Sequence, residues 1–100
     1  MLKVMITMDK LKVFGLTYAI ERVPYISRDE YRAGEIDFEK QEIRILDSLS
    51  AEHQKQTIIH EMIHAIFVGL GMNDYSDNEA LVQSLATALH QCLTENHGLI

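Results

Sequence analysis

The chain has 100 residues, of which 47% are hydrophobic and 24% charged, and its formal net charge is −6. This length suffices for one modest hydrophobic core, so we expect a single domain over residues 1–100. The acidic excess argues against a nucleic-acid partner, because binding to phosphates needs a basic surface. The sequence contains neither a basic amphipathic stripe nor an apolar run of membrane-spanning length, so we expect no membrane partner either.

The beginning of the chain and its cysteine content bear on location. The N-terminal residues MLKVMITMDK lack the long apolar run of a signal peptide. Cys92 is the single cysteine, so no internal disulfide can form. We therefore expect a cytoplasmic protein whose partner is a protein or a peptide.

The first half of the chain has the composition of β-strands. Residues 11–20 are rich in β-branched, aromatic and leucine side chains and have no helix cap, which predicts one strand. Gly15 indicates a bulge or a close backbone approach within it, and Pro24 ends the segment. Residues 25–34 could hold a short helical turn, and residues 1–8 could form a further short strand.

A β-hairpin is predicted over residues 35–46. Ile36 and Phe38 alternate with polar residues, and Ile43 and Ile45 do the same a few positions later. The polar EKQ between these two runs is typical of a hairpin turn.

A well-delimited helix follows the hairpin. Ser50 is a natural N-cap, and Gly69 and Gly71 provide a stop. The apolar residues of this helix recur at helical spacing and predict a stripe that faces the core: Ile59, Met62, Ile63 and Ile66.

A second helix is predicted from Ser76 or Asp77 to about Thr94, after a turn-forming loop. Its apolar stripe consists of Val82, Leu85, Ala86, Leu89 and Leu93. Cys92 is expected to be a small buried hydrophobic residue. Together the elements predict an α+β fold, in which a small antiparallel sheet packs on two main helices.

The pentapeptide HEMIH carries the chemistry of the first helix. The window 58–68 is apolar nearly all round except for His60, Glu61 and His64, which lie within about a third of the helix circumference. Histidines at positions i and i+4 project side by side, so both imidazoles can bind one metal ion. Glu61 lies beside them but off the line of ligands, where a general base can take a proton from an activated water. The pattern therefore predicts a zinc centre.

A catalytic zinc ion needs a third protein ligand besides His60 and His64. The zincin pattern with a third histidine fails, because Phe67 and Leu70 occupy the positions that it requires. Glu79 fits best, since it opens the second helix and could point back at the first. Asp74 and Asp77 in the loop are weaker alternatives, and His90 and His97 lie deep in or beyond the second helix.

Two further roles depend on the start of the second helix. Ser76 and Glu79 also form the S-x-x-E of a capping box, which would explain the glutamate without any metal. We favour the ligand role, because a zinc site with two protein ligands is poor. Tyr75 is a candidate donor of a hydrogen bond to the tetrahedral intermediate.

More of the chain than the pentapeptide resembles a known family. A glycine, an acidic hairpin that ends in EIRIL, the helix TIIHEMIHAI and the later NEALVQSLATAL follow one another in an order similar to that of ImmA/IrrE-type metallopeptidases of bacteria and phages. These are small zincins of the gluzincin type. The resemblance implies a minimal zincin-like fold with zinc held by His60, His64 and Glu79, and with Glu61 as general base.

The resemblance also implies how a substrate would bind. The strand near Ile43 to Leu46 would border the cleft and could pair with an extended peptide. A transcriptional regulator is one candidate substrate.

Three functions are compatible with the sequence. The first is a zinc-dependent endopeptidase, and the second is an inactive zinc-binding interaction module derived from a peptidase. The third is a structural α+β domain in which HEMIH is a coincidence. Glu61 favours the first over the second, because a structural zinc site needs no general base.

Overall fold

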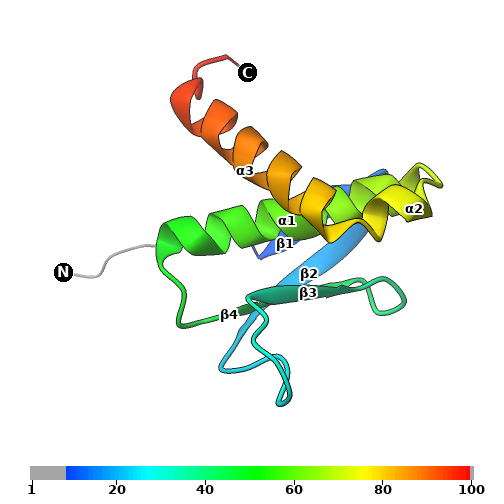
Figure 1. Cartoon of the computed structure of the whole chain (residues 1–100), viewed down its shortest axis with the longest axis vertical. Helices are drawn as coiled ribbons and strands as arrows, with labels where there is room; N and C mark the ends of the chain where they lie inside the picture. Colours follow the sequence, from blue (N-terminus) through cyan, green and yellow to red (C-terminus); the bar gives the residue numbers. More distant parts are fainter. Residues whose placement is uncertain (1–8, 100) are drawn as a thin grey trace.

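A mixed sheet and three helices make up the protein in our computed structural model, which describes residues 9–99 (Figure 1). The sheet has the order β1-β2-β4-β3. Its strands are β1 (Lys10–Val13), β2 (Leu16–Val23), β3 (Gly34–Asp37) and β4 (Glu42–Leu46). The α+β class is as predicted, but the expectation of an antiparallel sheet is wrong. Strands β2 and β4 are parallel, because the chain passes through β3 at the edge and returns between β3 and β2.

A tight turn divides the segment 11–20, which we had predicted to be one strand. Phe14 and Gly15 both have positive φ, at 50° and 84°, and β1 pairs antiparallel with β2 on either side of them. Two successive left-handed residues are the signature of a two-residue hairpin whose twist matches that of the strands. Gly15 thus marks a reversal of the chain and not a bulge.

The predicted hairpin of residues 35–46 is confirmed. Strands β3 and β4 pair antiparallel, and Asp37 Oδ1 accepts hydrogen bonds from the backbone N–H groups of Glu39 and Lys40 in the turn. Strand β2 ends directly before Pro24, as expected, but residues 25–33 form no helical turn. The short strand proposed for residues 1–8 lies outside the described residues.

Helix α1 (Ala51–Gly69) has the caps that the sequence indicates. The Ser50 hydroxyl accepts a hydrogen bond from the His53 backbone N–H at 3.1 Å. At the other end Gly71 has a φ of 75°, and the Met72 N–H donates to the Phe67 carbonyl at 2.8 Å. This pairing satisfies the last carbonyls of the helix in a Schellman motif.

Two helices follow, α2 (Asn73–Ser76) and α3 (Glu79–Glu95). The N-cap of α3 is Asn78, whose side chain accepts from the Leu81 N–H at 3.0 Å. Helix α3 therefore begins later than predicted, because Ser76 belongs to the short helix α2. No described helix has both the length and the apolar character needed to cross a membrane.

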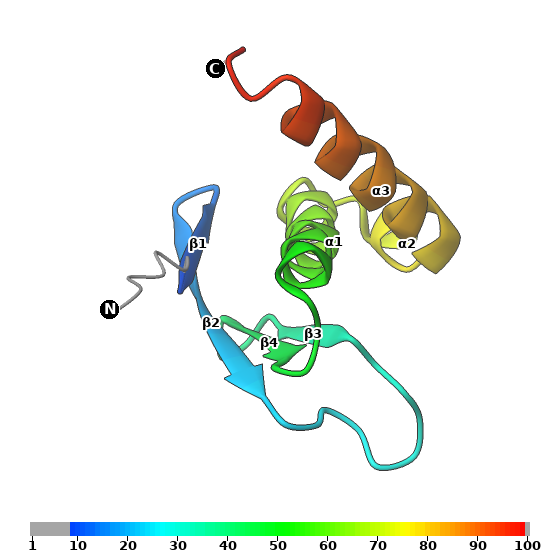
Figure 2. The same ribbon diagram turned by 90° about the vertical axis from the view of Figure 1, so that its left-hand side faces the viewer.

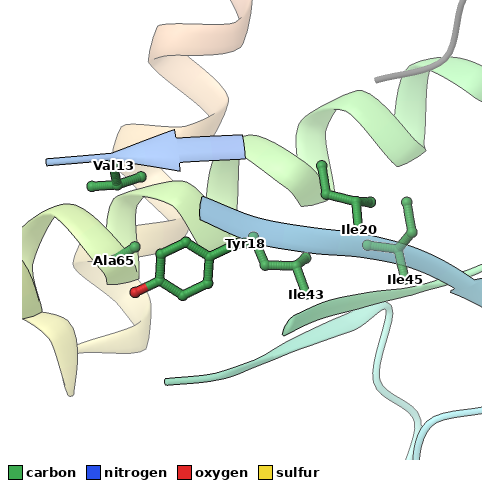
Figure 3. Close-up of a cluster of buried hydrophobic side chains, with 6 residues drawn as sticks. All are labelled: Val13, Tyr18, Ile20, Ile43, Ile45 and Ala65. Carbon is green, nitrogen blue, oxygen red and sulfur yellow. The ribbon is translucent and has the colours of Figure 1, made fainter. Parts of the chain in front are cut away.

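Helix α1 lies between the sheet and α3 (Figure 2). Toward the sheet, Ala65 of α1 belongs to a buried apolar cluster, which Figure 3 shows. The other members of this cluster are Val13, Tyr18, Ile20, Ile43 and Ile45. On the opposite side Ile63 packs against Val82 and Ala86 of α3. The apolar character of α1 nearly all round thus reflects burial on two faces.

Helix α3 is packed over its first half alone. Of its predicted stripe, Val82 and Ala86 are buried, whereas Leu85, Leu89 and Leu93 are 41%, 37% and 40% exposed. Cys92 is also exposed, contrary to prediction. The reason is the direction of the helix, which leaves α1 at an angle in both views (Figures 1 and 2).

Strand β3 approaches α1 closely at Gly34. A Cβ atom at this position would lie 2.6 Å from Thr57 Cγ2 and 3.1 Å from the Arg44 carbonyl oxygen. Contacts this short cannot persist without a shift of the strand or the helix, so glycine is needed for this approach.

We therefore expect Gly34→Ala to destabilise the protein by about 1–3 kcal/mol in urea unfolding. Gly98→Ala is the matched control, since a Cβ there would meet no atom within 4 Å. Adding Thr57→Ser should restore part of the loss, because it removes Cγ2 and keeps the hydroxyl that donates to the His53 carbonyl. Equal stability of the two alanine variants would contradict this packing.

Candidate metal centre

Three potential ligands converge between α1 and α3. His64 Nε2 lies 2.8 Å from Glu79 Oε1, and His60 Nε2 lies 3.2 Å from Glu79 Oε2. One ligand atom from each of the three residues falls within 4.8 Å of the other two. Each histidine presents the same nitrogen to the same carboxylate, as ligands of one ion would.

Local structure explains this convergence. His60 and His64 are one turn apart on α1, with ring centroids separated by 5.0 Å. Glu79 is the first residue of α3, where the Asn78 cap and the burial of Val82 against α1 hold the helix start in place. Because Ser76 is not the N-cap of α3, no capping box forms and Glu79 is free to face the histidines.

Both histidines also have a partner at the second ring nitrogen. His60 Nδ1 lies 2.8 Å from Gln83 Oε1, and His64 Nδ1 lies 3.1 Å from the Ser76 hydroxyl. Partners of this kind orient the imidazole of a metal ligand. Our sequence reasoning missed both. The contact of Gln83 could have been predicted, because Gln83 lies four residues after Glu79 and so on the same face of the helix. The contact of Ser76 could not, because it depends on the short helix α2.

The cluster opens into a cleft of about 660 Å³. One wall comes from α1, another from the segment Ser76 to Gln83, and the third from residues 30–38, which include β3. The prediction that the strand Ile43 to Leu46 borders the cleft is wrong. That strand is β4, which lies inside the sheet, and the edge strand that lines the cleft is β3.

Glu61 lies at the floor of this cleft and is 5% exposed. Its carboxylate makes no hydrogen bond or ion pair with any residue that the structure describes, and a Cβ at Gly34 would lie 3.3 Å from its Oε2. Burial, and then the negative charges of Glu79 and Glu35, raise the pKa of Glu61 from 4.5 to about 8, while Arg32 lowers it. No side-chain oxygen among the described residues is both fully buried and without a hydrogen-bond partner, so the Glu61 oxygens remain open to the cleft although the side chain as a whole is buried. A largely buried carboxylate that faces a cleft and has a raised pKa is a candidate functional group.

The lowered pKa of His64 favours metal binding. Burial lowers its pKa, although the negative charge of Glu79 acts in the opposite direction. A lowered pKa favours the neutral imidazole, which is the form that coordinates a metal ion.

Other candidates from the sequence lie outside the cluster. Asp77 lines the cleft but is not among the three converging residues, and Asp74 and His90 do not line it. Tyr75 stacks on Phe67 with ring centroids 5.7 Å apart and does not line the cleft. It is therefore not placed to donate to a reaction intermediate there.

The donor set can be compared with what metals require. Two imidazole nitrogens and one carboxylate oxygen make up one of the three-ligand sets of catalytic zinc. A carboxylate beside them that is no ligand fits the same chemistry. The residues present therefore suit a zinc ion and a reacting water.

Comparison with known proteins gives no independent guide to identity. No family model matches the chain, and neither the curated proteins nor the solved structures contain a match.

We expect purified protein to hold about one zinc ion per chain and Glu79→Ala to hold much less, because two histidines alone form a poor site. Metal content can be measured by plasma mass spectrometry on protein purified without a histidine tag. His53→Ala and Asp77→Ala are matched controls, since both residues line the cleft outside the cluster. Full zinc in Glu79→Ala would remove that residue from the site.

The buried carboxylate also predicts a pH dependence for the metal-free protein. The pKa of Glu61 is about 8 in the folded protein, above the ordinary glutamate value of 4.5 that applies in the unfolded chain. Its contribution to stability is therefore fully present below the unfolded pKa and is lost as the pH rises through the folded pKa.

Glu61→Gln should remove this loss, because an amide does not titrate. In urea unfolding with chelator, wild type should lose stability relative to the variant between about pH 5 and pH 8, by up to about 1.4 kcal/mol for each pH unit. Parallel stability curves for the two proteins would contradict the burial of Glu61.

Proposed function

We propose that the protein is a zinc-dependent metallopeptidase that hydrolyses peptide bonds with Glu61 as general base. The observation that carries this proposal is the position of Glu61, whose side chain is largely buried, makes no ion pair among the described residues and lines the cleft together with His60, His64 and Glu79. A structural zinc site needs no such group, and a stable domain would gain from replacing it.

The proposed roles follow from the chemistry of each residue. His60, His64 and Glu79 would hold zinc, which when bound polarises a carbonyl group and lowers the pKa of water. Glu61 would take a proton from the attacking water and deliver it to the leaving amine. Its position supports this role, because a general base must lie within reach of the proton that it accepts, and Glu61 lines the same cleft as the three proposed ligands.

The cleft suits an extended peptide chain. Strand β3 lies at the edge of the described sheet and lines the cleft through residues 34–36, so its outer backbone groups are available for pairing. A substrate that adds a strand there would pass in front of the proposed zinc ligands. We therefore propose a protein or peptide substrate that pairs with β3, with a transcriptional regulator as one candidate.

The fold fits the same proposal. A helix that carries HExxH, packed against a small sheet with an edge strand over the cleft, and a second helix that supplies a glutamate are compatible with a minimal zincin-like arrangement. We propose that the chain is a compact member of the gluzincin type, similar to ImmA/IrrE-type metallopeptidases.

We expect Glu61→Gln to keep its zinc and to lose activity by about 10²–10⁴-fold, because the amide cannot accept the proton. Cleavage of a mixed peptide library, followed by mass spectrometry, measures this with zinc-loaded protein. His53→Ala, which changes the cleft outside the cluster, should stay active.

The same variant separates catalysis from simple binding. If zinc-loaded wild type cleaves no peptide, and wild type and Glu61→Gln bind the same protein or peptide equally well, the protein is a zinc-binding interaction module. Equal cleavage by wild type and Glu61→Gln would instead remove Glu61 from the mechanism.

A further inference from the structure

The pairing of β3 with β4 shows which backbone groups of the edge strand are free. The Leu46 N–H donates to the Ala33 carbonyl at 2.9 Å, and this pair continues the antiparallel register of the two strands. Hydrogen-bonded pairs alternate along such a ladder with pairs that are not hydrogen-bonded. Gly34 and Ile36 hold the alternate positions, so their backbone N–H and C=O groups point away from β4 to the outer edge.

That outer edge lies beside the proposed general base. Strand β3 is last in the order of the described sheet and lies below α1 (Figure 2). A Cβ atom at Gly34 would lie 3.3 Å from Glu61 Oε2. A peptide strand paired with β3 would run about 4.8 Å from it. The residue of the peptide that faces Gly34 would therefore lie next to the reacting groups.

The same register determines what the next side chains of a bound peptide would meet. Opposite residues of paired strands place their side chains on the same face of the sheet. On β3 this face has no side chain at Gly34 and an isoleucine at Ile36, which packs against the buried cluster and also lines the cleft. A peptide residue opposite Ile36 would thus direct its side chain at an apolar surface.

Phe38 enlarges this apolar surface. It lies two residues after Ile36, lines the cleft and is 38% exposed. An exposed aromatic side chain is common by itself. Phe38 stands out because the other residues of this turn are polar and because it lies in the cleft, where a bound side chain could cover it: Asp37, Glu39, Lys40 and Gln41 are the polar residues.

We propose that the backbone groups of Gly34 and Ile36 anchor the substrate, and that Ile36 and Phe38 form an apolar subsite for a large apolar side chain of that peptide. The inference rests on the proposed peptidase function and adds a substrate class to it. Antiparallel pairing is the more stable arrangement. The apolar residue then lies two positions nearer the peptide's N-terminus than the residue that faces Gly34.

Binding of a random library of ten-residue peptides tests the subsite without cleavage. The library is offered to Glu61→Gln, once loaded with zinc and once with chelator, and the retained peptides are identified by mass spectrometry. We expect enrichment of leucine, isoleucine, phenylalanine and methionine at one position of the retained peptides. The apolar subsite contains no proposed metal ligand, so the preference should persist with chelator.

Substitutions at Phe38, made in the same protein, test whether this residue provides the preference. Phe38→Ser should weaken binding of the selected peptides by about tenfold, whereas Phe38→Leu should keep both affinity and preference. Tyr25→Ser is the matched control, since Tyr25 is an exposed aromatic residue that does not line the cleft. Retention of no peptide, or a preference that Phe38→Ser leaves unchanged, would overturn the proposal.

N-methylation of a selected peptide, one residue at a time, tests the backbone anchors. Methylation of the residues that face Gly34 and Ile36 should each weaken binding by about tenfold, because each removes a donor to β3. Methylation of the residue between them should have little effect, since its N–H points away from β3. Equal losses at three successive residues would contradict this register.

Cleavage by zinc-loaded wild type then separates the inference from the function on which it rests. We expect the apolar residue at the second or third position before the cleaved bond. An apolar preference only after that bond would overturn the proposed register. Apolar-selective binding without any cleavage would count against the peptidase function alone and would leave the subsite established.

Discussion

The burial of α1 on two opposite faces is the constraint on which the rest of the structure depends. Ala65 faces the sheet and Ile63 faces α3, so the helix is held from both sides. Its polar residues can then lie only where these two layers leave a gap. That gap is the cleft, and it places His60, Glu61 and His64 where a third element can reach them.

The ionisable side chains of the cleft form an arrangement that a bound cation would stabilise. The negative charge of Glu79 adds to burial in raising the pKa of Glu61. Burial also lowers the pKa of His64 and so weakens the positive charge that could offset them. A cation between the imidazoles and the Glu79 carboxylate would relieve this imbalance and favour the ionised form of Glu61. Such local cost in a stable fold is typical of a functional site.

Unequal packing along α3 suits the position of Glu79. The first half of the helix is anchored by its Asn78 cap and by Val82 and Ala86, which are buried against α1. Glu79 lies at this anchored end, one turn before Gln83, whereas the exposed Leu89 and Leu93 lie in the other half. A ligand at the fixed end of a helix keeps its position even when the far end has few contacts.

Sequence patterns over a few neighbouring positions were enough to predict the elements that local contacts stabilise. The Ser50 cap, the hairpin of residues 35–46 and the spacing of HEMIH all rest on contacts within a few positions along the chain. The α+β class followed from them. The turn at Phe14 was missed because a phenylalanine with positive φ is uncommon, and composition alone favoured a continuous strand.

Tertiary structure decided the features that depend on which elements lie side by side. The parallel pairing of β2 with β4 left β3 as the strand next to the cleft. No local sequence pattern shows which of the two strands of a hairpin will pair with a third strand. The choice of Glu79 over the capping box required the start of α3, which the short helix α2 displaced. The burial of Glu61 and the contact of Gln83 with His60 likewise arise between distant segments. The sequence by itself determined which side chains could carry the chemistry, and the packing of α1 between two layers decided which of them meet.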